Sequence, residues 1–280
     1  MENISKKLIE KSILGNRQAL EKIVENIQDR IFGLALRMLY DPDDAEDACQ
    51  EILIRVVTNL ATFKGDSAFE TWVYRIACNH LLSIRKKQSE VAAVSFQEYG
   101  DQLDKTSSYE WDTKNVGPLE NLIVEETRIG CLQGMLLCLN RDQRIVFLLQ
   151  VVFHVSSKQG AEILGISAEA FRKRLSRAKE QMHDFLFNNC ALVNPDNGCK
   201  CKRYAAQELK RGIKQEELTF AGKICQAKQN QQIQKHLSEL DELDKMKELF
   251  NSYSDHILPI DFVGYMKQLI HSGKFDVISS

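Results

Sequence analysis

The sequence lacks any apolar run close to the roughly 18 residues that a membrane-spanning helix needs. Its first residues, MENISKKLIEKSILGN, are amphipathic and carry no small-residue cleavage site. It also lacks a strong charge of either sign, because 37 Lys and Arg stand against 39 Asp and Glu. Any surface that binds a polyanion must therefore be local. We expect a cytoplasmic protein with no membrane partner.

Cysteine and proline are also scarce. Eight cysteines in 280 residues are too few for a disulfide scaffold. The four prolines, Pro42, Pro118, Pro195 and Pro259, divide the chain into segments. Within those segments apolar residues recur at intervals of three and four, and nothing alternates with the period of a strand. The pattern predicts an all-α protein with more than one domain.

The helical pattern is interrupted between Ser89 and Glu126, where nine acidic residues accompany two bases and aliphatic residues are few. Such a composition is typical of a flexible linker. We therefore predict a helical domain at 5–88, an acidic flexible linker at 89–118, a smaller helical domain at 119–187, and a cysteine-containing helical extension at 188–280. The extension includes a helix from Gln231 to Tyr253.

The second domain contains the pattern of a helix-turn-helix. A short helix at about 157–164 is followed by Gly165, which can adopt the left-handed conformation that ends one helix before another begins. Ser167 is placed to cap the second helix. On a wheel of 3.6 residues per turn, Phe171, Leu175, Ala178 and Met182 form one buried stripe.

The opposite face of that second helix is cationic. It collects Glu169, Arg172, Lys173, Ser176 and Arg177, and residues 158–180 contain six bases against three acids. A cationic exposed helix of this kind suits the DNA major groove, where Arg and Lys contact guanine edges or phosphates. The alternative is a solvated charged face on an ordinary helical hairpin.

Two stretches of the first domain carry unusual chemistry. The segment DPDDAEDACQEILIRV places six acids ahead of its only cation, Arg55, and Asp41 or Asp43 would cap its helix. The segment FKGDSAFETWVYRIACNHLLSIRKK combines aromatic residues with terminal bases, as in surfaces that stack unpaired bases and hold a phosphate backbone. Alternatively, Phe69, Trp72, Val73 and Ile76 belong to the core.

Taken together, DAEDACQEILIRV, FKGDSAFETWVYRIACNHLLSIRKK, the acidic linker and LNRDQRIVFLLQ…AEILGISAEAFRKRLSRAKEQM resemble the extracytoplasmic-function (ECF) sigma factors of bacterial RNA polymerase. The resemblance covers about residues 10–187, with both blocks in the expected order. It implies two sigma domains, regions 2 and 4, joined by a linker.

The resemblance also implies partners, core RNA polymerase and promoter DNA, and the residues that bind them. The acidic helix would bind the polymerase clamp through Asp43, Asp44, Glu46, Asp47, Gln50 and Glu51. The loop 64–67 and the helix after it would bind the −10 element through Lys64, Asp66, Ser67, Trp72, Asn79, Arg85 and Lys86. The −35 element would be read by Arg172, Lys173, Ser176 and Arg177, the same residues that the helical wheel turns outward.

Four positions depart from the family pattern. Asn140 stands in place of a usual proline, Gly160 in place of an isoleucine-like core residue, Ala170 in place of a hydroxyl residue, and Cys78 in place of a common arginine beside Asn79. Gly160 would remove a buried side chain and add about 1 kcal/mol of helix penalty. Fewer polar contacts would weaken or alter promoter preference.

A cysteine cluster follows the second domain. His183, Cys190, Cys199 and Cys201 would complete a tetrahedral zinc site, although their spacing is not that of a strong CxxC pair. The alternative interpretations are a redox-sensitive thiol pair and cysteines with no special role. The neighbouring basic residues would lower the pKa of these thiols. We expect no other cofactor.

The residues after the second domain exceed what a two-domain sigma factor needs. We hypothesise that this extension regulates the chain in cis; a packing extension without a regulatory role is the alternative, and an anti-sigma factor is a further candidate partner. No phosphate-binding loop, HExxH or paired-acid motif suggests an enzyme. The competing functions are a stand-alone helix-turn-helix regulator and a metal- or redox-sensing interaction protein.

Overall fold

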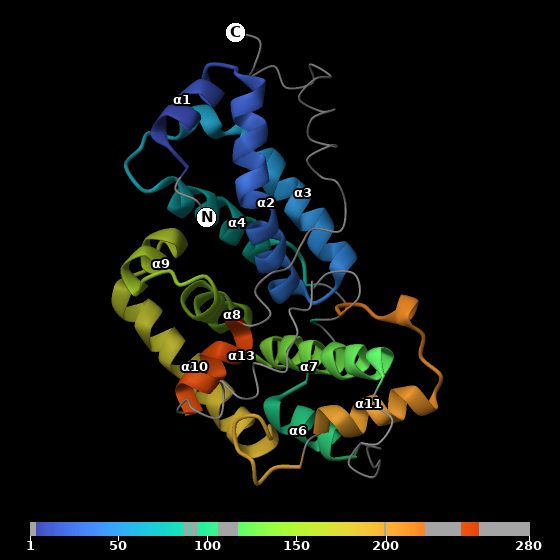
Figure 1. The fold of residues 1–280 in the computed structure, drawn as a ribbon. Coiled ribbons are helices and arrows are strands. Elements are labelled where there is room, and N and C mark those ends of the chain that lie inside the picture. Colours follow the sequence, from blue (N-terminus) through green and yellow to red (C-terminus); the bar gives the residue numbers. More distant parts are fainter. Residues whose placement is uncertain are drawn as a thin grey trace.

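The computed structural model describes residues 4–86, 90, 94–105, 117–198, 200–221 and 242–251 (Figure 1). Every regular element in these ranges is helical and none is a strand, which confirms the predicted all-α class. The predicted helix at 231–253 falls partly outside the described residues, which include its segment α13 (Glu242–Asn251).

The first domain is a bundle of four helices. It consists of α1 (Lys6–Ile13), α2 (Arg17–Leu39), α3 (Pro42–Thr58) and α4 (Phe69–Ser83), with a short 3₁₀ turn, η1 (Leu60–Thr62), after α3. Helices α2 and α3 make the most extensive contact of the bundle. Their facing sides are largely apolar, with Ile31, Leu34, Ile52 and Leu53 buried.

The second domain contains five helical elements. They are α7 (Pro118–Cys138), α8 (Arg141–Phe147), a π-helical turn η2 (Leu148–Val152), α9 (Ser157–Leu164) and α10 (Ala168–Asn189). Asn140 caps α8 by accepting a hydrogen bond from the backbone N–H of Gln143 at 2.9 Å. Because asparagine is a favoured N-cap, the loss of the usual proline does not remove the start signal of this helix.

The described part of the predicted linker differs from the expectation of a flexible segment. Residues 96–105 form a helix, α6 (Phe96–Lys105), which packs against α7 and α10. The rings of Phe96 and Tyr99 both contact Phe185 of α10, with centroids 5.5 and 5.6 Å apart. The acidic residues of this segment lie on the solvent side, and its aromatic residues anchor it to the second domain.

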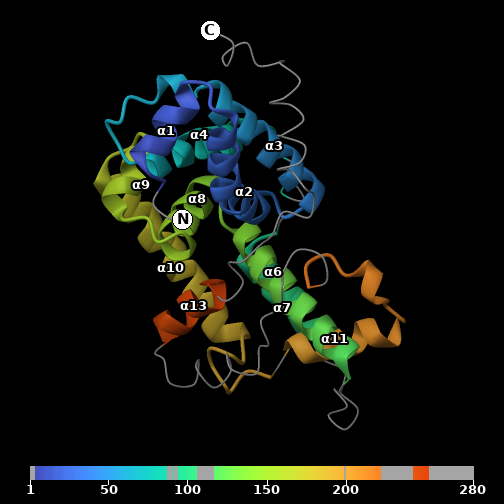
Figure 2. The ribbon, with the colours of Figure 1, turned by 45° about the horizontal axis from the view of Figure 1, so that its top comes forward.

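The two domains are packed directly against each other rather than held apart (Figure 2). Helix α4 contacts α9, and their buried residues belong to one continuous apolar core. At this junction the ring of Tyr74 lies 5.7 Å from that of Phe153. Arg75 of α4 forms an ion pair with Glu162 of α9 at 3.2 Å.

A buried ionic cluster reinforces the junction between the domains. Glu90, in the segment after α4, pairs with both Arg141 and Arg144 of α8. The Arg144 guanidinium also donates to the backbone carbonyl of Met38 in α2 and to that of Leu139. The carboxylate and both guanidiniums are nearly or fully buried, so the cluster depends on every partner being present.

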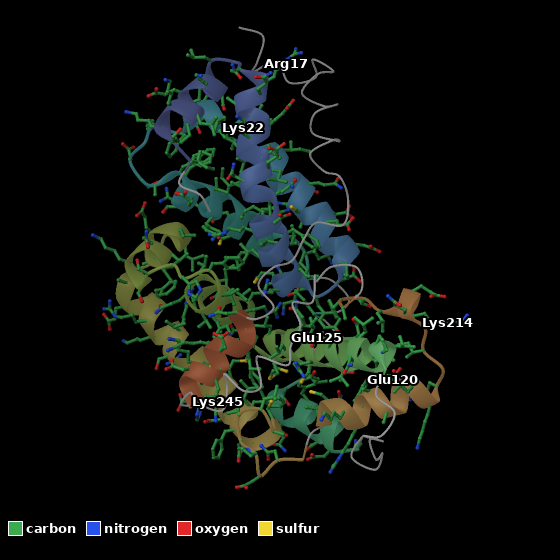
Figure 3. The ribbon with its side chains drawn as sticks, in the orientation of Figure 1. Arg17, Lys22, Glu120, Glu125, Lys214 and Lys245 are labelled. Atoms are coloured by element: carbon green, nitrogen blue, oxygen red, sulfur yellow. The ribbon has the colours of Figure 1, made fainter. Side chains whose placement is uncertain are left out.

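The extension carries three further described elements, α11 (Lys200–Lys210), the 3₁₀ turn η3 (Gln215–Glu217) and α13. Helix α11 lies along α7. Figure 3 labels Lys245 on α13, and its ammonium donates to the carbonyl of Val193 at 3.3 Å. Phe250 of α13 meets Phe147 edge to face, with centroids 5.1 Å apart. The described part of the extension is therefore packed onto the second domain.

A carboxylate of α7 also holds the extension in place. Glu126 accepts hydrogen bonds from three consecutive backbone N–H groups, those of Thr219, Phe220 and Ala221, at 2.7–2.8 Å. The ring of Phe220 packs edge to face on Tyr40, the residue that ends α2. We call this arrangement the Glu126 clasp. Through it the extension contacts both domains.

Candidate nucleic-acid interface

The helix-turn-helix is built as its sequence predicts. Ser156 starts α9 with a capping box that it forms with Gln159. Gly165 ends α9 in the left-handed conformation, with φ of 63°. Ser167 caps α10 by accepting from the backbone N–H of Ala170 at 3.1 Å. Phe171, Leu175, Ala178 and Met182 are buried, so the predicted stripe is confirmed.

Gly160 is a glycine inside α9, as the sequence shows, and the space of its missing side chain is filled by a neighbouring helix. The ring of Phe171 occupies the space in front of it, and a Cβ placed on Gly160 would lie far inside van der Waals contact with that ring. Phe171 itself is completely buried. The missing side chain is thus replaced by a larger one from the neighbouring helix.

The outward face of α10 presents the predicted cations. Arg172, Lys173, Ser176 and Arg177 are all exposed. Lys173 forms an ion pair with Glu169 one turn earlier at 2.7 Å. Arg174 lies off this face and instead pairs with Asp142 of α8 at 3.4 Å, which braces α10 against the rest of the domain. The four exposed residues form one surface, which we call the α10 reader face.

The first domain holds a second polar surface. A groove of about 450 Å³ opens between α3, η1 and α4. Its walls include Trp72 and Asn79, which the sequence pointed to, and also Asn59 and Thr62, which it did not. Asn59 and Thr62 come from the end of α3 and from η1, and only the fold brings them opposite α4. We call this the α3–α4 groove.

An aromatic cluster anchors the loop beside this groove. The rings of Phe63, Phe69 and Trp72 contact one another, with centroids 5.3–5.7 Å apart. Phe69 is buried, whereas Trp72 is half-buried and also lines the groove. The core assignment is therefore confirmed for Phe69, and the stacking role of Trp72 stays a prediction. The cluster fixes the two ends of the loop and leaves its middle residues at the surface.

The remaining residues predicted to contact the −10 element lie at or near the surface. Gly65 adopts a left-handed conformation with φ of 79°, which turns the loop outward. The exposed residues are Lys64, Asp66, Asn79, Arg85 and Lys86, and Ser67 is half-buried. Cys78, by contrast, is completely buried and is not part of this surface.

His80 lies between the groove and the acidic helix. Its side chain is buried, and Nε2 lies 3.7 Å from a carboxylate oxygen of Glu51. Burial lowers the pKa of His80 below its usual value, and the Glu51 carboxylate only partly opposes that shift. The imidazole is therefore neutral at physiological pH.

The acidic helix α3 starts as predicted. Asp41 caps it by accepting from the backbone N–H groups of Asp43 and Asp44, at 3.0 and 3.1 Å. Burial and the nearby carboxylates of Asp43 and Asp47 raise the pKa of Glu46. Of the predicted polymerase-binding residues, Asp43, Asp47 and Glu51 are exposed, while Asp44, Glu46 and Gln50 are half-buried.

The cysteine cluster does not assemble a metal site among the described residues. Cys190 and Cys201 line one cavity, but the described part of the chain contains no group of three or more His, Cys, Asp or Glu side chains that could hold a metal ion. His183 stacks on Phe187 and lies 3.4 Å from Asp184. Cys199 lies outside the described residues.

None of the helices in the described ranges is both long and apolar enough to cross a membrane. A helix-turn-helix with an exposed cationic face, packed on a helical bundle with an acidic helix and a polar groove, defines a two-domain DNA-binding protein. Comparison with known proteins narrows this class.

Two family models match the chain. Sigma-70 region 2 matches residues 23–91 and Sigma-70, region 4 matches residues 129–182. The ECF RNA polymerase sigma factor SigW of Bacillus subtilis is 31% identical over 65% of this chain and 96% of its own. The ECF RNA polymerase sigma-E factor of Escherichia coli is 29% identical, in an alignment that covers 62% of this chain and 89% of the sigma-E chain. The chain belongs to the ECF family of RNA polymerase sigma factors.

A solved structure is also similar. CnrH in complex with the cytosolic domain of CnrY aligns with a TM-score of 0.46 and 19% identity, over 66% of this chain and 98% of that one. The family assignment rests on the sequence relatives.

Proposed function

We propose that this chain directs bacterial RNA polymerase to promoters through three surfaces, namely the acidic face of α3, the α3–α4 groove with its adjoining loop, and the α10 reader face. As an ECF sigma factor it acts in transcription initiation and binds core RNA polymerase and promoter DNA. Sigma factors are initiation factors rather than enzymes, and the proposed role requires no catalytic group.

The α10 reader face is proposed to contact the −35 element. Its three cations and one hydroxyl are exposed on a single helix that the turn at Gly165 directs away from α9. Arg can donate to two acceptors of a guanine in the major groove, and Lys can hold a phosphate. This exposed cationic face is the observation that carries the assignment.

The α3–α4 groove is proposed to receive unpaired bases of the −10 element. Trp72 offers an aromatic surface at its edge, and Asn79 offers an amide donor and a carbonyl acceptor. Arg85 and Lys86 are exposed beyond the end of α4, where they can hold the backbone of the same strand. The combination suits single-stranded DNA better than a duplex, because a base can enter the groove only when it is unpaired.

The acidic face of α3 is proposed to bind core polymerase. Asp43, Asp47 and Glu51 are exposed, and a surface of one sign favours a partner of the other sign. A stand-alone helix-turn-helix regulator would have no use for this surface, so it distinguishes the two functions.

The extension is proposed to regulate these surfaces in cis. The Glu126 clasp and the Phe220–Tyr40 contact connect the extension to both domains, at a residue that lies two positions before the start of α3. Regulation within the chain and capture by an anti-sigma factor are alternative ways to control the same surfaces.

The proposed function is tested by transcription from purified components. Core polymerase with this chain should produce run-off transcripts from a subset of a promoter library, and the chain should co-elute with core polymerase. Replacing Asp43, Asp47 and Glu51 together by alanine should abolish co-elution, whereas replacing the exposed acid Glu10 should not. If the unmodified chain neither co-elutes nor supports transcription, the assignment is wrong.

A further inference from the structure

A cavity of about 490 Å³ lies where the described parts of the chain meet. Its walls come from the end of α2 (Tyr40), from α6 (Tyr99), from α7 (Cys131), from α11 (Tyr204) and from the clasp (Phe220). We propose that this cavity binds a neutral, mainly apolar small molecule that carries a ring system and a hydrogen-bond acceptor.

The size and lining of the cavity suit such a ligand. Pockets for small molecules usually measure about 300–1,000 Å³, are lined mainly by apolar and aromatic side chains, and lie at junctions between domains. Here most of the lining is aromatic or aliphatic, with Leu132, Met135 and Leu192 among its walls. Rings stack favourably on aromatic walls of this kind.

The charged groups of the cavity favour a neutral ligand because each has a partner in the chain. Glu126 is held by the three N–H groups of the clasp. Glu208 pairs with Arg211 at 2.9 Å, and Glu217 accepts from the backbone N–H of Lys214 at 2.7 Å. Among the described residues that line the cavity, the cation is Arg128, and it pairs with Glu125. An anionic ligand would therefore meet carboxylates, and the described lining offers it no cation that is not already paired.

Tyrosine hydroxyls supply the polar recognition. Burial and the nearby Glu126 carboxylate raise the pKa of Tyr40, so its hydroxyl stays protonated and can donate. The hydroxyl of Tyr99 already donates to the carbonyl of Cys131 at 3.4 Å. A ligand with a carbonyl or ether oxygen directed toward Tyr40 would satisfy this donor.

The position of the cavity gives a bound molecule a structural effect. It would contact the end of the first domain, the second domain and the extension at once, so occupancy stabilises the arrangement in which all three are packed together. An effect of the bound molecule on transcription would depend on the proposed sigma function. Binding of the molecule to the cavity does not depend on it.

Binding is tested on the full chain without polymerase or DNA, so its failure leaves the sigma function untouched. The probe is Nile red, a neutral aromatic dye with a carbonyl acceptor, titrated by fluorescence. We expect saturable binding at one site. Cys131→Phe and Leu192→Trp, which fill the cavity from different walls, should weaken binding by about tenfold or more. Asn121→Phe, which adds the same ring at an exposed position of α7, should bind the dye normally.

A second measurement uses the unmodified chain and therefore locates the dye even if the cavity-filling variants do not fold. Bound dye should slow the modification of Cys131, Cys190 and Cys201 by N-ethylmaleimide, read out peptide by peptide by mass spectrometry. Cys138, on α7 but outside the cavity, should be modified at an unchanged rate. Unsaturable binding, equal affinity for the anionic dye anilinonaphthalene sulfonate, or unchanged labelling of the three cavity cysteines would overturn the proposal.

Discussion

The ring of Phe171 fills the space that any side chain at Gly160 would need, so these two residues form a matched pair across the helix-turn-helix. Glycine inside a helix normally costs about 1 kcal/mol relative to alanine. In this protein the cost of Gly160 is offset by packing, because the large ring of Phe171 from α10 lies directly on the α9 backbone.

The first prediction concerns this pair. Gly160→Ala should lower the free energy of unfolding by about 1–3 kcal/mol, because the new methyl group collides with the Phe171 ring. In a Phe171→Val background the same change should stabilise the protein, since the helix gains and nothing collides. Urea unfolding of the four proteins of this double-mutant cycle measures the coupling. Equal effects of Gly160→Ala in both backgrounds would contradict the packing described.

The second prediction concerns the α10 reader face. Arg177→Ala should weaken binding of the −35 element by about 1–3 kcal/mol if the side chain contacts a base, and should relax specificity at that position. Lys7→Ala removes one exposed cation from α1, in the other domain, and serves as the control. Run-off transcription over a promoter library gives both readouts. An unchanged promoter profile removes Arg177 from the readers.

The third prediction concerns the Glu126 clasp. Glu126→Ala should speed hydrogen exchange at the amides of Thr219, Phe220 and Ala221, since all three lose their acceptor. If the extension restrains the sigma domains, transcription with core polymerase should rise in the same variant. Glu120→Ala, on the first turn of α7, is the control.

These two readouts separate regulation from packing. Faster exchange together with unchanged transcription would identify the extension as a packing element without a regulatory role. Unchanged exchange would show that the clasp does not hold the extension in solution.

The fourth prediction concerns pH. Burial holds the pKa of His80 below its usual value of 6.5, so the unfolded chain binds a proton more readily than the folded one. The contribution of His80 to stability is therefore complete above pH 6.5 and is lost as the pH falls through the lower pKa of the folded state.

The fourth prediction is measured by urea unfolding at several pH values between 8 and 5. His80→Asn should reduce the loss of stability in this interval, because the variant carries no imidazole to protonate at this buried position. A steeper loss in the His80 variant would contradict the assignment.

The features that the sequence predicts best are local ones. Gly165, Ser167 and the stripe from Phe171 to Met182 act within one or two helical turns, so periodicity and capping rules were sufficient to place them. The same rules placed Asp41 at the start of α3. The outward position of Arg177 followed from the same wheel.

Long-range contacts could not be derived in this way. Glu90 meets Arg144, and Glu126 meets the amide of Phe220, across separations of 54 and 94 residues. Nothing in the local pattern links such partners, because their proximity depends on how complete helices pack. Asn59 and Thr62 joined the α3–α4 groove for the same reason.

Helix α6 was missed for a different reason. The abundance of acids in its segment indicated a flexible linker, yet Phe96, Tyr99 and Leu103 recur at intervals of three and four, which was the signal of an amphipathic helix. The net charge of the segment reflects the acidic residues on the exposed side of this helix, and it gives no information about the apolar residues on the buried side.

The buried cluster of Glu90, Arg141 and Arg144 has a consequence for how the factor finds its targets. Helices in contact, such as α4 and α9, have axes about 10 Å apart, whereas elements centred near −10 and −35 are separated by about 85 Å of B-form DNA at 3.4 Å per base pair. If the α3–α4 groove and the α10 reader face bind these two elements as proposed, the contact between α4 and α9 would have to open before one chain could hold both at once.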